Sequence, residues 1–145
     1  MMFRTLDPKR MAKLRGGVNL DKHLLHGIKQ FNLDPQRGIE ILLQRDYIKM
    51  ESESIATFLL NQERLSKKQI GAYLGARLEF NQSVLNSFVK LHKFSNLLLV
   101  QALRQFLWSF RLPGEAQQID RIMSVFAAHY CQQNPGKGSS LSQKF

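Results

Sequence analysis

Glu115, in the segment Pro113-Gly114-Glu115, is the carboxylate with the clearest setting for chemistry. A very apolar stretch precedes this segment, a second helical pattern follows it, and Pro-Gly pairs commonly separate two helices. The glutamate can simply complement the dipole of the helix that it begins, which is worth about 0.3–1 kcal/mol. It can also be presented on a rigid loop to an anion-binding site of a partner. The spacing alone leaves both interpretations open.

Other residue types that perform chemistry do not form convincing patterns. The four histidines are scattered and there is one cysteine, so no spacing typical of a metal site occurs, although His23 and His26 can share a helix face. Gly71-Ala-Tyr-Leu-Gly75 lacks the Gly-Lys-Ser/Thr that a phosphate-binding loop needs. Ser139 and Ser140 have no recognisable triad partners. We therefore expect no metal site and no cofactor.

The chain is strongly basic. Its 145 residues, of which 43% are hydrophobic, are enough for one domain with a core. The formal net charge is +10, and seven basic residues in the first thirty face only two acidic ones. These basic residues are Arg4, Lys9, Arg10, Lys13, Arg15, Lys22 and Lys29, and the acidic ones are Asp7 and Asp21. Such a run indicates an anionic partner, either membrane or nucleic acid, or it is only a solvated tail.

The sequence favours a cytoplasmic location. Cys131 is the single cysteine, so no intrachain disulfide can form, which suits a reducing compartment. Polar residues interrupt the apolar run after Leu97 well short of the ~18 residues that span a membrane. No apolar core of a signal peptide follows the basic start.

Apolar residues after residue 20 recur at helical spacing, and no alternating run is long enough to predict a strand. Asp34 followed by Pro35 predicts a capped helix start, and Ser54 and Ser66 are predicted to cap two later helices. We expect an all-α architecture of about seven short helices, packed antiparallel or as a right-handed stack.

Two helices should flank Glu115. Residues 96–110 are apolar on nearly every side, so we expect a central helix that neighbours cover on several sides. Residues 116–132 have an amphipathic pattern and should form the helix after the loop.

Residues 110–123, FRLPGEAQQIDRIM, resemble the first signature motif of the Sec-seven domain, the catalytic module of guanine nucleotide exchange factors for Arf-family small GTPases. The resemblance extends through residues 97–111, back to residues 69–75 and 31–39, and forward to residues 130–136. It covers about residues 28–136, and the sequence of these segments is most similar to the cytohesin branch.

This resemblance implies a function, a fold and a site. The expected fold is a right-handed superhelix of α-helices, and the expected activity promotes GDP release from an Arf-family small GTPase, which regulates Arf signalling and vesicle trafficking. By motif position Glu115 is the glutamic finger, the catalytic residue that repels the β-phosphate of GDP and displaces Mg²⁺. The residues expected to contact the GTPase are Phe110, Arg111, Leu112, Pro113, Gly114, Ala116, Ile119 and Met123.

Several of these assignments have an alternative within the chain itself. Ile119 and Met123 can belong to an ordinary core instead of a partner groove. Arg111 and Arg121 can pair with acidic groups of the GTPase or only with the neighbouring Asp120. Exchange changes no covalent bond, so the resemblance implies neither a nucleophile nor a bound cofactor or metal in this chain.

The resemblance stops at Gly136, because residues 137–145 do not resemble the family's second signature motif. We therefore divide the chain into a basic flexible arm (1–20), the N-terminal part of a Sec-seven domain (21–136) and a divergent disordered tail (137–145). In the family, the second motif forms the other wall of the groove that binds the GTPase. The resemblance therefore implies that exchange activity is impaired. The alternatives are a non-catalytic Arf-binding or inactive fragment, and a basic helical module for anionic membrane or nucleic acid. Of these two ligands, peripheral membrane contact through the basic arm is favoured over nucleic acid.

Overall fold

The computed structural model describes residues 21–136, and all regular structure within that range is helical. The helices are α2 (Lys22–Leu33), α3 (Pro35–Gln44), α4 (Ser52–Asn61), α5 (Lys67–Gly75), α6 (Glu79–Lys90), α7 (Leu99–Trp108) and α8 (Ala116–Gln133). The prediction of an all-α fold of about seven helices is therefore confirmed. The right-handed superhelical path stays a prediction. The expected basic arm, residues 1–20, and the expected tail, residues 137–145, lie outside the described residues.

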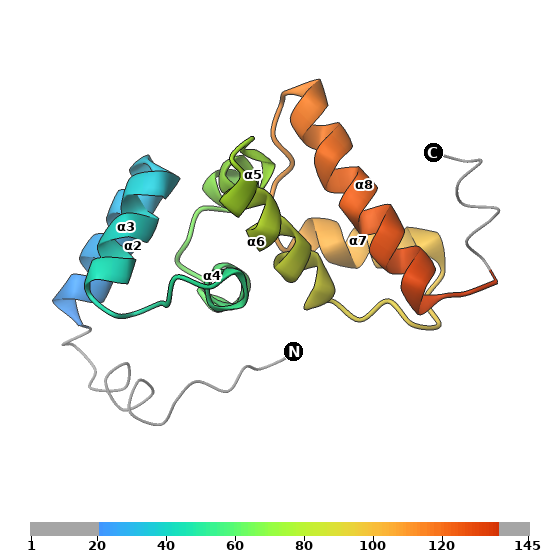
Figure 1. Ribbon diagram of the computed structural model, residues 1–145, viewed down its shortest axis with the longest axis horizontal. Coiled ribbons are helices and arrows are strands. Elements are labelled where there is room, and N and C mark those ends of the chain that lie inside the picture. The colour runs from blue at the N-terminus through green and yellow to red at the C-terminus, as the bar shows by residue number, and fades with distance from the viewer. Residues whose placement is uncertain (1–20, 137–145) are drawn as a thin grey trace.

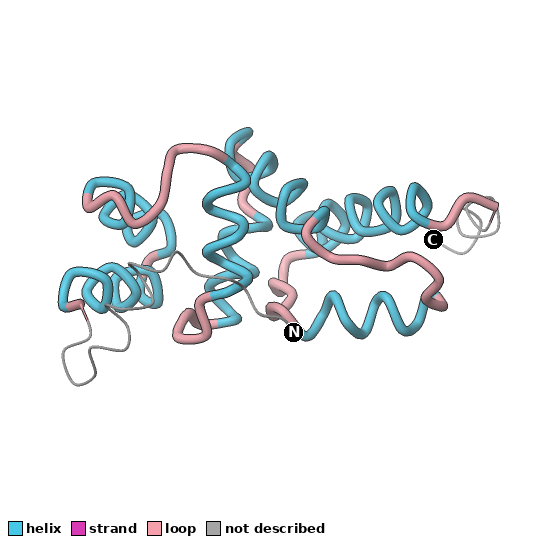
Figure 2. Tube along the Cα trace, turned by 90° about the horizontal axis from the view of Figure 1, so that it is seen from below, coloured by secondary structure: helices cyan, strands magenta, loops and turns pink. Residues whose placement is uncertain are grey.

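Helices α5 and α6 connect the two ends of the molecule. Figure 1 shows α2 and α3 at one end, α4 to α6 in the middle, and α7 and α8 at the other end. Helix α3 packs against both α2 and α5, while α6 packs against α4, α5 and α8. Helix α5 also contacts α8, so it lies beside both the first and the last helices of the described chain. In the view from below, α7 runs beneath α8 and a loop connects them (Figure 2).

Two of the three predicted helix caps are confirmed. The side chain of Asp34 accepts a hydrogen bond from the backbone N–H of Arg37 at 3.5 Å, and Pro35 is the first residue of α3. Ser66 Oγ accepts from the N–H of Gln69 at 3.3 Å. The prediction for Ser54 was wrong: α4 begins at Ser52, and Ser54 Oγ accepts from the N–H of Lys49 at 2.9 Å instead.

An aromatic cluster joins α6, α7 and α8. Its rings are those of Phe88, Phe94, Phe106, Phe110 and Phe126, which are all at most 2% exposed. The ring centroids of Phe106 lie 4.9 Å from Phe110 and 5.2 Å from Phe126. These separations are typical of favourable aromatic pairs. Because Phe110 lies two residues after the end of α7, the cluster also fixes the start of the loop toward α8.

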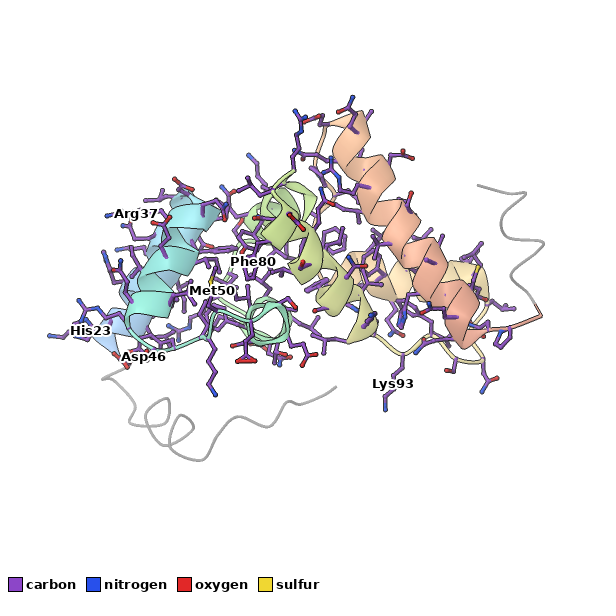
Figure 3. All side chains as sticks on the ribbon, in the orientation of Figure 1. His23, Arg37, Asp46, Met50, Phe80 and Lys93 are labelled. Carbon is purple, nitrogen blue, oxygen red and sulfur yellow. The ribbon has the colours of Figure 1, made fainter. Side chains whose placement is uncertain are left out.

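The C-terminal end of α8 is bonded to the segment before α7. The side chain of Asn134 donates to the carbonyl of Phe94 at 3.0 Å and accepts from the N–H of Asn96 at 3.0 Å. The hydroxyl of Tyr130 donates to the carbonyl of Leu97 at 2.6 Å. These bonds satisfy backbone groups of the loop before α7, among them the buried carbonyl of Phe94. Lys93, in the same loop, extends away from the body (Figure 3).

Helix α7 is less covered than its sequence predicts. Only Ala102 and Phe106 are buried along its length, whereas Val100 is 61% and Trp108 is 69% exposed. The expectation of a central helix covered on several sides was therefore wrong. Phe106 packs against Phe88 of α6 and Phe126 of α8, which cover one side of α7, whereas Val100 and Trp108 are exposed. No helix within residues 21–136 combines the length and the hydropathy that crossing a membrane requires.

Candidate functional site

The Glu115 loop, residues 109–115, connects α7 to α8. Figure 1 shows it rising beside α5 to the start of α8. Glu115 is the N-cap residue of α8, yet its side chain makes no capping hydrogen bond. The carboxylate is exposed, and it makes no hydrogen bond or ion pair to another residue in the described range. It is therefore presented to solvent at the tip of a helix.

The first half of the Glu115 loop is bonded to its surroundings. The backbone N–H of Arg111 donates to the carbonyl of Lys67 at 3.0 Å, and Lys67 Nζ donates to the carbonyl of Trp108 at 2.6 Å. Ser109 Oγ donates to the carbonyl of Phe106 at 2.6 Å. The Arg111–Lys67 bond joins two backbones and constrains the path of the loop whatever its side chains are, and the other two bonds add side-chain donors from Lys67 and Ser109.

The predicted partner-contacting residues differ in exposure. Arg111, Gly114, Ala116 and Glu115 are exposed, and Leu112, Pro113, Ile119 and Met123 are half-buried. All of these lie around the loop and the first two turns of α8. They are therefore brought together at one place, and their contact with a partner stays a prediction.

Phe110 has a different environment from the one expected. Its side chain is 2% exposed, and its ring lies edge-on to Phe88 at a centroid distance of 5.9 Å. The ring is therefore part of the aromatic cluster and is not accessible to a partner in this structure. Its position at the end of an apolar helix did not reveal which neighbours would cover it.

The two arginines near the loop have separate environments. Arg121 Nη1 donates to the carbonyl of Gly75 at 2.5 Å, so this side chain connects α8 to α5. The guanidinium of Arg111 is exposed and forms no ion pair with Asp120 or any other described residue. The alternative that Asp120 neutralises these arginines is therefore not what the structure shows.

A surface cleft next to the loop was not predicted. It has a volume of about 440 Å³, and its lining residues are Lys67, Val100, Leu103, Arg104, Leu107 and Trp108. The ammonium of Lys67 lies 5.6 Å from the centroid of the Trp108 ring, a distance at which a cation and an aromatic face attract. The spacing of residues 100, 103, 104, 107 and 108 marks one helix face, but the sequence did not show that this face is open.

The site can act through its charge. Within residues 21–136, no three histidine, cysteine, aspartate or glutamate side chains are grouped as metal ligands would be. What the loop offers is one exposed carboxylate on a constrained backbone, beside an apolar cleft with two basic residues. That arrangement suits electrostatic action on a charged group of a partner.

Relatives of known identity match this chain over most of its length. A model of the Sec7 domain family, the Sec-seven domain of the motif resemblance, matches residues 20–144. Human Cytohesin-3 is 56% identical over 116 residues, which is 80% of this chain and 29% of that protein. Mouse Cytohesin-4 is 48% identical over 134 residues, which is 92% of this chain and 33% of that protein.

Solved structures agree with the sequence matches. The Sec7p catalytic domain has a TM-score of 0.76 at 39% identity, covering 80% of this chain and 65% of that chain. A structure of ARF1-GDP bound to a Sec7 domain complexed with Brefeldin A has a TM-score of 0.74 at 34% identity, covering 87% of this chain and 62% of that chain.

The present chain spans less than a third of the length of Cytohesin-3. The family match passes Gly136, and the predicted domain boundary at that residue stays a prediction. Because the family model matches far more than half of the residues, and the seven described helices resemble solved members, the chain belongs to the Sec7 domain family.

Proposed function

We propose that this chain promotes guanine nucleotide exchange on an Arf-family small GTPase and so takes part in Arf signalling and vesicle trafficking. The observation that carries this proposal is the exposed carboxylate of Glu115 on a loop whose backbone is fixed. A Sec7 domain with 34% sequence identity is bound to ARF1-GDP in a solved structure, which supports a GTPase of that family as the partner.

The proposed mechanism is electrostatic. A nucleotide in a GTPase is bound through its phosphates and Mg²⁺, so a negative charge placed next to the β-phosphate weakens both interactions. At about 4 Å, two unit charges repel by about 4 kcal/mol at an effective dielectric constant of 20. This corresponds to roughly a thousandfold loss of affinity. No covalent bond forms or breaks, and Glu115 returns unchanged after GDP leaves.

The neighbouring residues would position the GTPase. Leu112, Pro113 and Ala116 flank the carboxylate, and Gly114 has open space around it, so a partner backbone can approach closely. Ile119 and Met123 continue this surface along α8 as half-buried apolar residues. Arg111 contributes an exposed positive charge that can pair with an acidic group of the partner.

The test is release of fluorescent GDP from an Arf-family GTPase, measured with the unmodified chain and with Glu115→Lys. We expect the unmodified chain to accelerate release and Glu115→Lys to abolish the acceleration, because lysine attracts the phosphate that glutamate repels. Glu53→Lys is the matched control. It makes the same change of charge at an exposed first-turn glutamate of α4, which has its main contacts with α6. Helical content should be equal in all three proteins.

Two outcomes would contradict the proposal. If Glu115→Lys accelerates release as well as the unmodified chain, Glu115 is not the acting carboxylate. If the unmodified chain binds the GTPase without accelerating release, it is a non-catalytic Arf-binding module instead.

We also propose cytoplasmic localisation with peripheral contact of the chain with anionic membrane. The support is the charge of the first twenty residues, where five basic residues face only Asp7. The cytoplasmic location is supported by the single cysteine, Cys131, which cannot form an intrachain disulfide.

A further inference from the structure

Helix α5 contains two buried glycines, Gly71 and Gly75, which are four residues apart and therefore lie on the same side of the helix. Glycine is the least favourable residue after proline inside a helix. Neither glycine has the positive φ that would require this residue type. The reason for glycine is therefore spatial and lies in what packs against this side of α5, which we name the glycine face.

At Gly71 the backbone of the Glu115 loop lies directly on α5. A Cβ atom built on Gly71 would be 1.8 Å from the carbonyl oxygen of Arg111 and 3.0 Å from its carbonyl carbon. Real Cβ atoms essentially never approach another atom this closely. The N–H of the same Arg111 donates to the carbonyl of Lys67, one turn earlier in α5. Gly71 thus permits a contact between two backbones that any side chain would prevent.

At Gly75 the helix contacts both sides of Glu115 in sequence. A Cβ on Gly75 would be 3.3 Å from Pro113 Cγ and 3.1 Å from Gln118 Cβ. The carbonyl of Gly75 accepts the 2.5 Å hydrogen bond from Arg121 of α8. The contacts of the glycine face therefore bracket Glu115, because Arg111 and Pro113 precede it while Gln118 and Arg121 follow it.

We propose that the glycine face of α5 fixes the position of Glu115, and that Gly71 and Gly75 are positioning residues for nucleotide exchange. The role in nucleotide exchange rests on the proposed function, whereas the effect on the position of Glu115 does not depend on it. Glu115 has no side-chain bond of its own, so its place in space depends on the backbone on either side of it. A displacement of about 1 Å at an acting group can cost about a hundredfold in rate.

The principal variant is Gly71→Ala, which we expect to push the Arg111 carbonyl away from α5. Gly75→Ala is the milder second variant, since its close contacts are with side chains and not with backbone. The matched control is Gly38→Ala. There a Cβ would be 2.3 Å from the Cα and 2.4 Å from the N of Phe31, which is also a backbone clash, but it lies between α3 and α2. The control separates general destabilisation from an effect on the loop.

The first measurement needs no GTPase. NMR compares the amide hydrogen exchange of Arg111 and the backbone chemical shift of Glu115 between the unmodified full-length chain and each variant. The temperature is well below the melting temperature of all four proteins. We expect Gly71→Ala to raise Arg111 exchange at least about tenfold and to shift the Glu115 signal, because the Lys67 carbonyl is lost as acceptor. Gly75→Ala should shift the Glu115 signal, and Gly38→Ala should change neither. Unchanged signals in both glycine-face variants would overturn the inference.

The second measurement is the maximal rate of GDP release and the chain concentration that gives half of it. We expect Gly71→Ala to lower the maximal rate at least about tenfold, and Gly38→Ala to leave it unchanged although it lowers the melting temperature. A displaced loop in Gly71→Ala together with an unchanged maximal rate would overturn the positioning role. If the unmodified chain itself does not accelerate release, the proposed function fails, and the NMR comparison alone decides whether the glycine face positions Glu115.

Discussion

At the scale of single residues, two buried histidines connect the aromatic cluster to α8. His92 is 6% exposed, and its Nδ1 donates to the carbonyl of Phe88 at 3.0 Å. Its other nitrogen, Nε2, is buried and makes no hydrogen bond within the described chain. His129, on α8, bonds through Nε2 to the carbonyl of His92 at 3.0 Å. Burial lowers the pKa of His92, the nearby His129 lowers it further, and backbone hydrogen bonds oppose the shift.

This pKa shift predicts loss of stability in acid. The unfolded chain binds a proton at His92 near its ordinary pKa of about 6.5, whereas the folded chain resists protonation. The contribution of His92 is therefore complete above about pH 6.5 and falls as the pH drops below it. The largest slope for one proton is about 1.4 kcal/mol per pH unit. We expect the free energy of urea unfolding to fall below about pH 6.5 with a slope up to this limit, and His92→Phe to flatten that fall. An equally steep slope in His92→Phe, with the exposed His26→Gln as control, would contradict the assignment.

Local chemistry at single residues could be predicted where the partner is close in sequence. Asp34 and Ser66 cap helices that begin one residue later, so their types and neighbours were sufficient. The prediction for Ser54 was wrong because its hydroxyl accepts a hydrogen bond from the backbone N–H of Lys49, in the preceding loop, and not from the first turn of a helix. The glycine face was missed altogether. Glycine is needed there because the Glu115 loop, about forty residues away in sequence, lies against α5. No local sequence pattern indicates that contact.

At the scale of elements, α7 has an exposed apolar face. Leu98 is 63% exposed and Trp108 is 69% exposed, and Val100, Leu103 and Leu107 lie between them along the cleft. Periodicity correctly predicted a helix in residues 96–110, although α7 itself is shorter (Leu99–Trp108). It could not predict coverage, because an apolar face has the same sequence pattern whether a neighbour lies on it or not.

This face predicts concentration-dependent association of the chain, since contiguous exposed apolar surface promotes contact with other surfaces. We expect Trp108→Arg to weaken association measured by sedimentation. Its cost in stability should be about 1 kcal/mol or less, because the ring is exposed and loses mainly its contact with Lys67. Leu33→Arg is the control, because Leu33 is 74% exposed on α2, outside this face. Equal weakening by both variants would show that net charge, and not the α7 face, controls association.

At the scale of the whole molecule, the motif and the number of helices in residues 21–136 were predictable, and the arrangement of these helices was not. The motif in residues 110–123 identified the family, which the family model and the solved structures confirm. The central place of α5 depends on its contacts with α3, α6 and α8, which bring together segments up to about one hundred residues apart. Such contacts are set by packing of the complete fold, so one sequence without related sequences does not contain a local signal for them.

The distribution of charge gives the last prediction. Residues 1–20 carry Arg4, Lys9, Arg10, Lys13 and Arg15 against Asp7, which is a net +4 of the chain's +10, and the first described helix begins only at Lys22. Near an anionic membrane surface each basic residue contributes about 1 kcal/mol. Deleting residues 1–20 should therefore weaken binding to vesicles that contain phosphatidylserine by at least about tenfold. The melting temperature should change little, because all seven helices described within residues 21–136 remain, together with the cap residue Asp21.

A second variant separates charge from chain length in this test. Replacing the five basic residues by glutamine should weaken vesicle binding as much as the deletion does, and added salt should weaken binding of the unmodified chain because it screens the attraction. Vesicles of neutral phosphatidylcholine should bind all three proteins equally poorly. A large fall in melting temperature on deletion, with unchanged vesicle binding, would instead place residues 1–20 within the folded unit, and the predicted domain boundary after residue 20 would be wrong.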